Sequence, residues 1–418
     1  MRIAVIGAGI VGVTSAYELA CDGHAVTVIE RRDSVASESS FANAGVIAPG
    51  YVTPWSSPGM LWKVLRQLPS RHAAIRIHGA ALLTQAPWLW RWWRACKPAT
   101  YAINRTAMWQ LASFSRERLQ ELTVMLGLEY ERRAGYTVLL RGDSELTQAR
   151  AGLRLLADLG VKFELVDGPR CRQLEPGLNP DTPLRAAIHL PQDGVGNCRQ
   201  FAQLLKAQAQ RLGVDFRFDT PVTDIAPGAP PTLRTSAGTE TFDAILLCTG
   251  IESPRLTRPL GLKLPLTPVH GYSITAPMRH VDGYPDLGPR SALMDERYKV
   301  AISRLGQRVR VAGSAELGGT LDTMNAAAIA TLYQVLDDWF PGATVANQVQ
   351  TWKGARPMLP DGPPLLGRSG REGIWVNLGH GSSGWALSCG SARVLADLMS
   401  QRTPAIDVAR LGVERLAH

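Results

Sequence analysis

Short apolar runs and one helical segment alternate over the first thirty residues. Residues 3–6 and 25–29 are apolar runs rich in Val and Ile, which are typical of buried strands in a parallel sheet. Residues 10–21 lie between them, contain no Pro and predict a helix. Two parallel strands need a crossover connection of this kind. The pattern therefore predicts a β–α–β unit at the amino terminus.

Three glycines mark the turn between the first predicted strand and the helix. Gly7 permits a tight turn, Gly9 lets a pyrophosphate approach the backbone, and Gly12 lets the helix pack closely against the strand. The backbone amides at the start of the helix, at Ile10 and Val11, would then face the phosphates. The spacing predicts a dinucleotide site. A glycine-rich turn without a ligand is the structural alternative.

An acidic residue, Glu30, ends the second predicted strand. A carboxylate at this position can accept hydrogen bonds from ribose hydroxyls and would repel a 2'-phosphate. The neighbouring Arg31 and Arg32 leave a phosphorylated ribose open as an alternative. The sequence favours a dinucleotide with a free ribose.

Periodic segments farther along the chain divide into two groups. Helical patterns occur at residues 106–126, 144–159, 198–211, 323–339 and 384–399. Apolar or alternating runs that predict strands occur at residues 136–140, 214–218, 242–247, 272–275, 298–303, 309–313 and 374–377. We expect an α/β cofactor domain formed by residues 1–50, 190–260 and 350–418. Residues 51–189 and 261–349 would form a substrate domain on an antiparallel sheet.

Residues 54–98 are rich in Trp and Arg, with four of the eleven tryptophans between positions 87 and 94. On a helix, Trp88, Trp92 and Trp93 would share one broad face opposite Arg91 and Arg94. This pattern fits a helix at a membrane interface, with rings at the headgroups and basic side chains on anionic lipid. It fits equally well a core helix that covers the substrate site, and the sequence leaves both open. Pro and Gly interrupt the long uncharged stretch at positions 41–62, so we expect no spanning helix.

The charge and the cysteines narrow the class of protein. Lys and Arg number 45 against 36 Asp and Glu, giving a net charge of +9, but the basic residues are dispersed. This argues against a nucleic-acid partner and favours an anionic substrate or an anionic membrane surface. The six cysteines are widely spaced without a metal-ligand pattern, so we expect reduced thiols, no metal and a cytoplasmic location. Because the first strand starts at residue 2, we also expect no signal peptide.

Several further motifs, in this order, make the chain resemble a known family. They are Ala42-Asn43-Ala44-Gly45, Thr249-Gly250, Arg356-Pro357 followed by Asp361-Gly362, and the glycine-rich turn from Gly379 to Trp385. Together with the amino-terminal glycines they resemble the bacterial FAD-dependent D-amino acid dehydrogenases of the small-subunit type. These belong to the superfamily of D-amino acid oxidase, glycine oxidase and sarcosine oxidase. The resemblance implies a Rossmann-like FAD domain of the glutathione-reductase type and a discontinuous α+β substrate domain.

The resemblance also implies how FAD binds. The pyrophosphate would lie at the first glycine turn, the ribose at Glu30, and the carboxy-terminal turn would place a helix amino terminus at the flavin pyrimidine, where the dipole stabilises negative charge. No Cys that could carry a covalent flavin near the Arg356 motif stands between Cys248 and Cys389, so we expect noncovalent FAD. The cofactor-binding residues implied are Gly7, Gly9, Ile10, Val11, Gly12, Glu30, Arg31, Ser39, Asn43, Ala44, Gly45, Val46, Val222, Thr249, Gly250, Gly379, His380, Gly381, Ser382, Ser383 and Gly384.

The implied reaction transfers a hydride from the α-carbon of a small D-amino acid to the flavin and yields a 2-oxo acid and ammonia. A guanidinium can bind both oxygens of the substrate carboxylate, and Arg356 is the expected clamp. Tyr298 and Tyr272 are expected to assist it as phenol donors to the carboxylate or as gates on the pocket, with Tyr51 a weaker choice. His380 lies between two glycines and is expected to be a loop residue near the flavin rather than the general base.

The resemblance implies that the electrons pass to a membrane quinone or another acceptor, with the enzyme peripheral on the inner face of the cytoplasmic membrane. Two enzyme alternatives stay open. One is a dehydrogenase of D-proline or hydroxyproline, and the other is an oxidase that uses oxygen. A flavoprotein subunit or adaptor without catalysis is the non-enzyme alternative. The sequence does not fix the oligomeric state, and a homo-oligomer is compatible with it.

Overall fold

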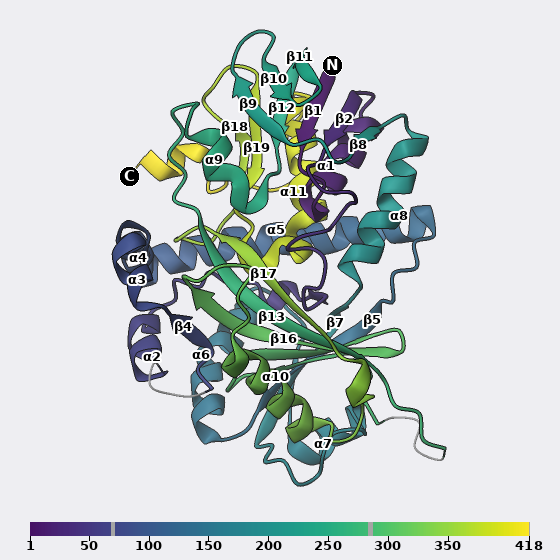
Figure 1. Ribbon diagram of the computed structural model, residues 1–418. Helices are drawn as coiled ribbons and strands as arrows, with labels where there is room; N and C mark the ends of the chain where they lie inside the picture. The colour runs from purple at the N-terminus through teal and green to yellow at the C-terminus, as the bar shows by residue number, and fades with distance from the viewer. Residues whose placement is uncertain (68–71, 283–286, 418) are drawn as a thin grey trace.

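The chain folds into two regions that lie one above the other in Figure 1, each built on its own sheet. The computed structural model describes residues 1–67, 72–282 and 287–417. Both chain ends lie in the upper region, and the helix α5 (Pro98–Leu126) crosses the molecule between the two regions. The predicted pairing of an α/β cofactor domain with a substrate domain is confirmed at this level, and the lower sheet is antiparallel except for two parallel strand pairs.

The upper sheet has six strands in the order β18-β19-β12-β1-β2-β8. All neighbouring pairs are parallel except β18 with β19. The strands are β1 (Arg2–Ile6), β2 (Ala25–Ile29), β8 (Asp215–Arg217), β12 (Ala244–Leu247), β18 (Leu365–Arg368) and β19 (Ile374–Leu378). They are buried on both faces, which explains their continuous apolar sequences.

Helices cover one face of this sheet, and a small sheet covers the other. The helices α1 (Ile10–Cys21), α8 (Cys198–Arg211) and α11 (Gly384–Met399) share one core with the strands. The predicted bounds of α1 and α8 agree with the structure. The opposite core is closed by the antiparallel strands β9 (Val222–Ala226), β10 (Thr232–Thr235) and β11 (Gly238–Thr241), together with α9 (Ser253–Thr257). A β-type crossover thus replaces a helix before β12.

The lower sheet runs in the order β17-β13-β16-β15-β14-β5-β7-β3, with β4 beside β16 and β6 beside β7. Its strands are β3 (Val46–Ile47), β4 (Ile75–Ile77), β5 (Arg133–Leu140), β6 (Glu164–Val166), β7 (Ala186–Val195), β13 (Thr267–Pro277), β14 (Ala292–Asp295), β15 (Val300–Leu305), β16 (Arg308–Leu317) and β17 (Gln350–Met358). The segments that form β3, β17 and the end of β7 were expected in the cofactor domain, but they pair into this sheet. The two regions are therefore more interleaved than the predicted boundaries.

The two faces of the lower sheet have different coverings. The helix α10 (Ala326–Trp339) packs on one face and buries Tyr272, Ile274, Val311 and their neighbours. The opposite face meets α6 (Asp143–Asp158) and the helices α2 (Met60–Gln67), α3 (Gly79–Thr84) and α4 (Ala86–Ala95). The short α7 (Gly168–Leu174) packs beside β7.

The helix α5 begins eight residues before the predicted start at position 106, because Pro98 occupies its first turn. It ends at Gly127, which adopts the left-handed conformation with φ 60°. Its middle lies so close to α11 that a Cβ at Gly390 would be 2.8 Å from the backbone of Ser115. This contact joins the helical cover of the upper sheet to the element between the two regions.

Candidate active site

One cavity of about 1550 Å³ extends from the carboxyl ends of the upper parallel strands to the face of the lower sheet opposite α10. Ligands of α/β sheets bind at this edge of parallel strands. The volume exceeds the range of about 300–1,000 Å³ that is usual for a single small ligand, so a cofactor and a substrate fit together. Every predicted cofactor residue lines this cavity except Gly12 and Gly45.

The first glycine turn is built for close approach. A Cβ on Gly12 would lie 1.8 Å from the carbonyl oxygen of Gly7, so only glycine allows α1 to start here. Gly7 itself has φ 99°, a left-handed value that favours glycine. A Cβ on Gly9 would meet nothing closer than the Ser40 hydroxyl at 3.7 Å, and Gly9 gives α1 no side-chain cap. The helix terminus is therefore open toward the cavity, as a pyrophosphate requires.

Carboxylates fix the positions of the charged side chains at the end of the cavity where Glu30 lies. Glu30 accepts hydrogen bonds from the amide of Ala8 at 2.6 Å and the amide of Arg32 at 2.9 Å, which fixes its carboxylate at the cavity wall. Arg31 pairs with Glu38 at 2.5 Å and with Glu252 at 3.2 Å. Arg32 pairs with Glu38 at 2.8 Å. Since both arginines already bind carboxylates, the arrangement favours a free ribose over a 2'-phosphate.

The loop from Ser39 to Val46 is held against the lower sheet. Ser39 donates its hydroxyl to the carbonyl of Ala355 at 2.5 Å, and Ser273 donates to the carbonyl of Ala42 at 2.8 Å. Arg310 donates to the carbonyl of Asn43 at 3.0 Å. Burial lowers the pKa of Arg310 to about 10, so it stays cationic at neutral pH behind this loop. Arg310 was not predicted from the sequence, and the only signal for it was a charged residue within an apolar, alternating strand.

The carboxy-terminal turn closes the cavity from the other side. Gly379 and Gly381 have φ values of 76° and 56°, and α11 follows directly. His380 is buried, and its Nε2 forms a hydrogen bond with the Ser391 hydroxyl at 3.1 Å. Burial lowers the pKa of His380 to about 3, so its ring is neutral at physiological pH. This agrees with a loop residue beside the cofactor rather than a charged partner of the substrate.

Arg356, on β17, presents a guanidinium to the cavity without a counter-ion. Its Nη1 donates to the carbonyl oxygens of Ser314 at 2.9 Å and His270 at 3.3 Å. Within residues 1–67, 72–282 and 287–417, no carboxylate forms an ion pair with it. Enclosure by protein lowers its pKa to about 10, which still leaves a cation at neutral pH. A partly buried cation with open donors is the expected binding group for an anionic ligand.

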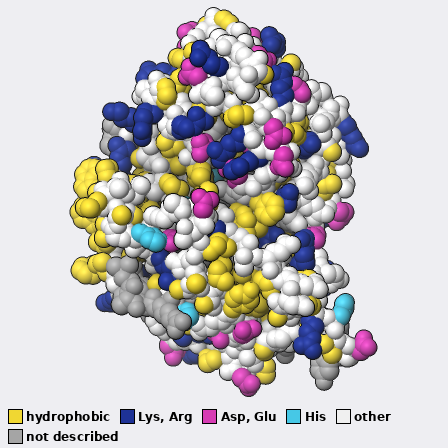
Figure 2. Space-filling view, in the orientation of Figure 1, with side chains coloured by type: hydrophobic (Ala, Val, Ile, Leu, Met, Phe, Trp, Pro, Cys, Tyr) yellow, Lys and Arg dark blue, Asp and Glu magenta, His cyan; other side chains and the backbone are white. Residues whose placement is uncertain are grey.

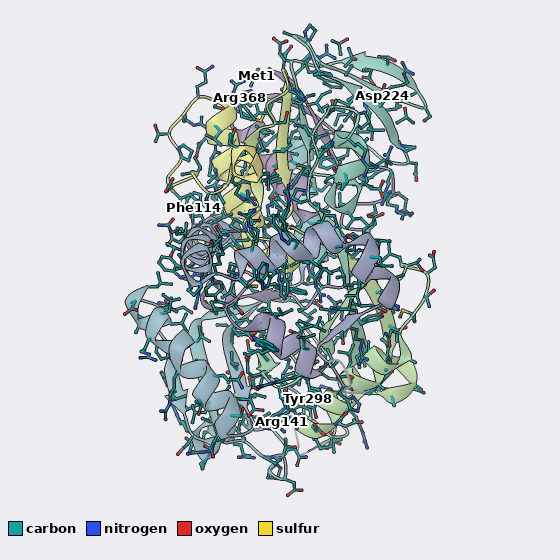
Figure 3. All side chains as sticks on the ribbon, turned by 90° about the vertical axis from the view of Figure 1, so that its left-hand side faces the viewer. Met1, Phe114, Arg141, Asp224, Tyr298 and Arg368 are labelled. Carbon is teal, nitrogen blue, oxygen red and sulfur yellow. The ribbon has the colours of Figure 1, made fainter. Side chains whose placement is uncertain are left out.

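Of the two tyrosines predicted to assist Arg356, Tyr272 lines the cavity but commits its phenol to another residue, and Tyr298 lies outside the cavity. Tyr272 is 1 % exposed and donates its phenol to Glu316 on the α10 side of the sheet. Neighbouring residues of a strand face opposite sides, and here Gly271 is the one that lies against the Arg356 guanidinium. Tyr298 does not line the cavity. It packs under Arg141, whose guanidinium carbon is 5.1 Å from the ring centroid, at the lower end of the molecule (Figure 3).

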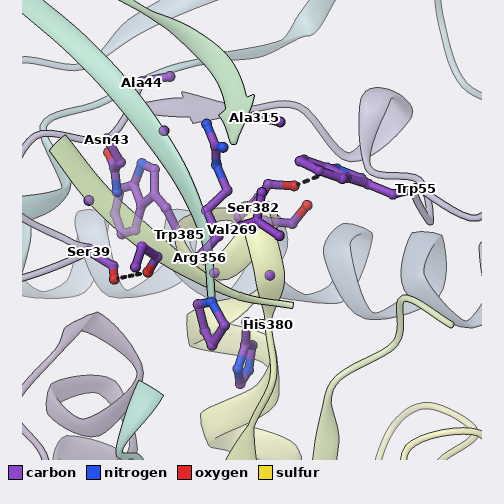
Figure 4. A pocket seen from close by; sticks show the side chains of 18 of the residues that line it. Ser39, Asn43, Ala44, Trp55, Val269, Ala315, Arg356, His380, Ser382 and Trp385 are labelled. Carbon is purple, nitrogen blue, oxygen red and sulfur yellow. Dashed lines mark hydrogen bonds between the residues drawn. The ribbon is translucent and has the colours of Figure 1, made fainter. Parts of the chain in front are cut away.

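Two aromatic residues of the cavity were missed or underrated. Trp55 donates its indole N–H to the Ser382 hydroxyl at 3.2 Å, and its ring lies 5.9 Å from the Arg356 guanidinium carbon (Figure 4). It therefore links the clamp to the carboxy-terminal turn. Tyr51 lines the cavity and donates its phenol to Glu296 at 2.7 Å. Trp55 stands in a Pro-rich stretch without periodicity, and the sequence carried no signal that it reaches Arg356.

Comparison with known proteins gives concordant results. The profile of a family described as FAD dependent oxidoreductase matches residues 2–398. A D-amino acid dehydrogenase of Cereibacter sphaeroides is 44 % identical, covering 100 % of this chain and 96 % of its own length. A D-amino acid dehydrogenase of Bradyrhizobium diazoefficiens is 41 % identical, covering 100 % and 99 %. The crystal structure of glycine oxidase from Geobacillus kaustophilus has the same fold, with a TM-score of 0.76 and 22 % identity over 99 % of this chain and 98 % of that chain.

Proposed function

The chain belongs to the family of FAD-dependent oxidoreductases, and on this premise we propose that it is a D-amino acid dehydrogenase. It converts a D-amino acid into the corresponding 2-oxo acid and ammonia. The observation that carries this proposal is the identity of 41–44 % to chains of that name over the full length of this one. The unpaired guanidinium in the cavity supports it, because an amino acid brings the carboxylate that the guanidinium lacks.

FAD is the cofactor, and the cavity has the features that it needs. The open start of α1 at Gly9 would hold the pyrophosphate, and Glu30 would accept hydrogen bonds from the ribose. The Ser39–Val46 loop and the turn at positions 379–384 would enclose the flavin from two sides. When bound, FAD supplies the hydride acceptor for the α-carbon, and water then hydrolyses the released imino acid.

The chain contributes binding and orientation. Arg356 holds the substrate carboxylate and thereby fixes the position of the α-carbon in the cavity. Trp55 limits how far the guanidinium can swing, because its ring lies beside Arg356 and its indole N–H is anchored on Ser382. An amine that binds in its neutral form needs no base from the chain. The neutral, internally bonded His380 agrees with such a mechanism.

An anaerobic titration of the purified yellow protein tests the function. We expect D-alanine and other primary D-amino acids to bleach the flavin absorption, and their L-enantiomers to leave it unchanged. A quinone analogue or dye should then restore the colour faster than oxygen does. Bleaching by D-proline or hydroxyproline alone would contradict the proposed substrate class, and rapid recovery with oxygen alone would indicate an oxidase. A flavin that no amino acid bleaches would favour the adaptor alternative.

We further propose that the enzyme docks on the inner face of the cytoplasmic membrane and delivers electrons to a quinone there. Exposed apolar side chains gather over α2, α3 and α4, at the left edge of Figure 2, and include Trp62, Leu65, Leu82, Leu83, Trp90 and Trp93. Arg66, Arg94 and Lys97 are exposed beside them. Aromatic rings at the headgroups with basic neighbours suit an anionic lipid surface. In the described part of the chain, no helix is both long and apolar enough to cross a membrane.

The sequence pattern placed Trp88, Trp92 and Trp93 on one face of a helix, but in the structure these residues are not all buried. Trp88 and Trp92 are buried in a core with Val269 and Met358, whereas Trp90 and Trp93 are each 53 % exposed. The core-helix alternative therefore holds for one pair, and the other pair is free to meet a surface. Residues 68–71 of this segment lie outside the described residues.

Exchanging Trp90 and Trp93 for Ser should release the protein from vesicles that contain anionic lipid. Burying a large apolar side chain contributes about 1.5–3 kcal/mol, so losing two should weaken binding by tenfold or more. Co-sedimentation with phosphatidylglycerol vesicles measures this. A matched control replaces Val124 and Met125, which are also exposed but lie at the far end of α5, with Ser. Equal sedimentation of both variants and the wild type would refute the docking surface.

A further inference from the structure

We propose that Gly271 is a substrate-positioning residue, which lays the Arg356 guanidinium flat and leaves one defined edge of it open for the substrate. The inference rests on the proposed function for the identity of the anion. Its geometry comes from three neighbouring strands, because β13 lies between β17, which carries Arg356, and β16. Gly271 lies on β13, in register with Gly354 of β17.

A β-bulge in β16 faces Gly271. The pairing of β13 with β16 shifts between His270, which faces Glu316, and Tyr272, which faces Gly313. Gly271 alone thus lies opposite two residues of β16, Ser314 and Ala315. Ser314 has φ 58°, an uncommon value for a residue with a side chain. Bulges of this kind redirect backbone groups beside active sites, and here the Ser314 carbonyl accepts the bond from Nη1 of Arg356.

The guanidinium lies directly on the Gly271 backbone. A Cβ at position 271 would be 2.3 Å from Nη2, 2.5 Å from the central guanidinium carbon and 2.7 Å from Nη1 of Arg356. Real side-chain carbons do not approach other atoms this closely. These are the three atoms nearest to that position, so the group that a side chain at 271 must displace first is the clamp itself.

The same contacts decide which edge of the guanidinium is available. An η nitrogen of Arg carries two N–H donors, and Nη1 uses them on the carbonyls of Ser314 and His270. Nε and Nη2 have no hydrogen-bond partner in the described part of the chain. These two nitrogens form one side of the planar fork, which can bind both oxygens of a carboxylate at once. We infer that the substrate carboxylate binds side-on to Nε and Nη2.

Gly271→Ala therefore separates a positioning role from a structural one. The displaced atoms are at the far end of a flexible side chain, so the fold can adapt while the open edge moves. We expect the Tm and flavin content to stay near the wild-type values. The KM for D-amino acids should rise about 10- to 100-fold, as expected when a hydrogen bond to a charged group is lost, with a much smaller change in kcat.

A second readout does not depend on turnover. Propionate and other simple carboxylates should perturb the flavin absorption of the resting enzyme, and Gly271→Ala should raise their Kd by a factor similar to the rise in KM. An unchanged Kd would overturn the positioning role whatever the substrate is. If the carboxylates behave as expected but no D-amino acid bleaches the flavin, the proposed function fails and the positioning of the clamp stands.

A double-mutant cycle with Arg356→Ala completes the test. Without the guanidinium there is nothing for the new Cβ to displace, so Gly271→Ala should add no further change in carboxylate Kd. If Gly271→Ala lowers the Tm on its own, the double variant should regain it, because the clash is with Arg356. If Gly271→Ala still raises the carboxylate Kd or lowers the Tm in a protein that already carries Arg356→Ala, position 271 serves another purpose and the proposal is overturned.

Discussion

An Arg356→Ala enzyme should keep its yellow colour and lose most of its affinity for D-amino acids. Two charge-assisted hydrogen bonds to the carboxylate disappear, and bonds of this class contribute about 1.5–3 kcal/mol each. We therefore expect a KM about a hundredfold higher or more. Steady-state kinetics with a dye acceptor measures the change, and the ratio of flavin to protein absorption checks that the cofactor is retained.

The stability of the same variant is informative. Enclosing an unpaired cation lowers the stability of the wild-type protein. The same enclosure lowers the pKa of Arg356 to about 10. Arg356→Ala removes that cation, so the Tm should stay level or rise while the activity falls, as is common for residues kept for function. Arg356→Lys is the matched control. It keeps the charge but not the planar fork, and its KM should lie between those of the wild type and the Ala variant. A KM that none of these changes moves would exclude Arg356 as the clamp.

The glycine turn could be predicted from the sequence because its requirements are local. The fixed spacing of Gly7, Gly9 and Gly12 carries the steric reason for the turn within six residues, and the apolar period fixes the helix that follows. The predicted bounds of α1, residues 10–21, match the structure. The same holds for α8, where Asn197 caps the helix by accepting the amide of Gln200 at 3.2 Å.

The environment of Arg356 could not be predicted, because it depends on register between strands far apart in sequence. Strand alternation places either Gly271 or Tyr272 against the Arg356 guanidinium, and only the pairing of β13 with β16 and β17 decides which. The sequence predicts Tyr272 as a phenol donor that assists Arg356 and predicts no role for Gly271. The structure uses the position instead for a glycine that supports the guanidinium. A bulge such as that at Ser314 leaves no mark in the hydrophobic pattern.

The pairing of β17 depends on register for a related reason. The segment of β17 precedes strands of the upper sheet and was assigned with them, but it pairs with β13 along nine residues. This pairing brings the clamp from one sheet to within reach of the turn that precedes α11 in the other. Ser39, which donates to the carbonyl of Ala355, ties the cofactor loop to the residue next to the clamp. Cofactor and substrate sites are therefore coupled through β17.

A Gly9→Val protein should fold and be colourless. A Cβ at position 9 meets no protein atom closer than 3.7 Å, so the chain itself tolerates a side chain there. The added atoms instead occupy the space above the start of α1, where a pyrophosphate must come close to the backbone amides. Losing two hydrogen bonds to a charged group should weaken FAD binding about a hundredfold or more. The flavin-to-protein absorption ratio of the purified protein measures this.

Gly12→Ala provides the contrast, because its defect arises inside the protein. Its Cβ would lie 1.8 Å from the carbonyl oxygen of Gly7, and neither backbone can move without opening the contact between β1 and α1. We expect this variant to lose both FAD and thermal stability, whereas Gly9→Val loses FAD and keeps the fold measured by circular dichroism. Gly79→Ala, at a helix start where no atom lies within 4 Å of the new Cβ, should change neither. A yellow Gly9→Val protein would mean that the dinucleotide does not lie against this turn, and the assignment of Glu30 and of the start of α1 would fail with it.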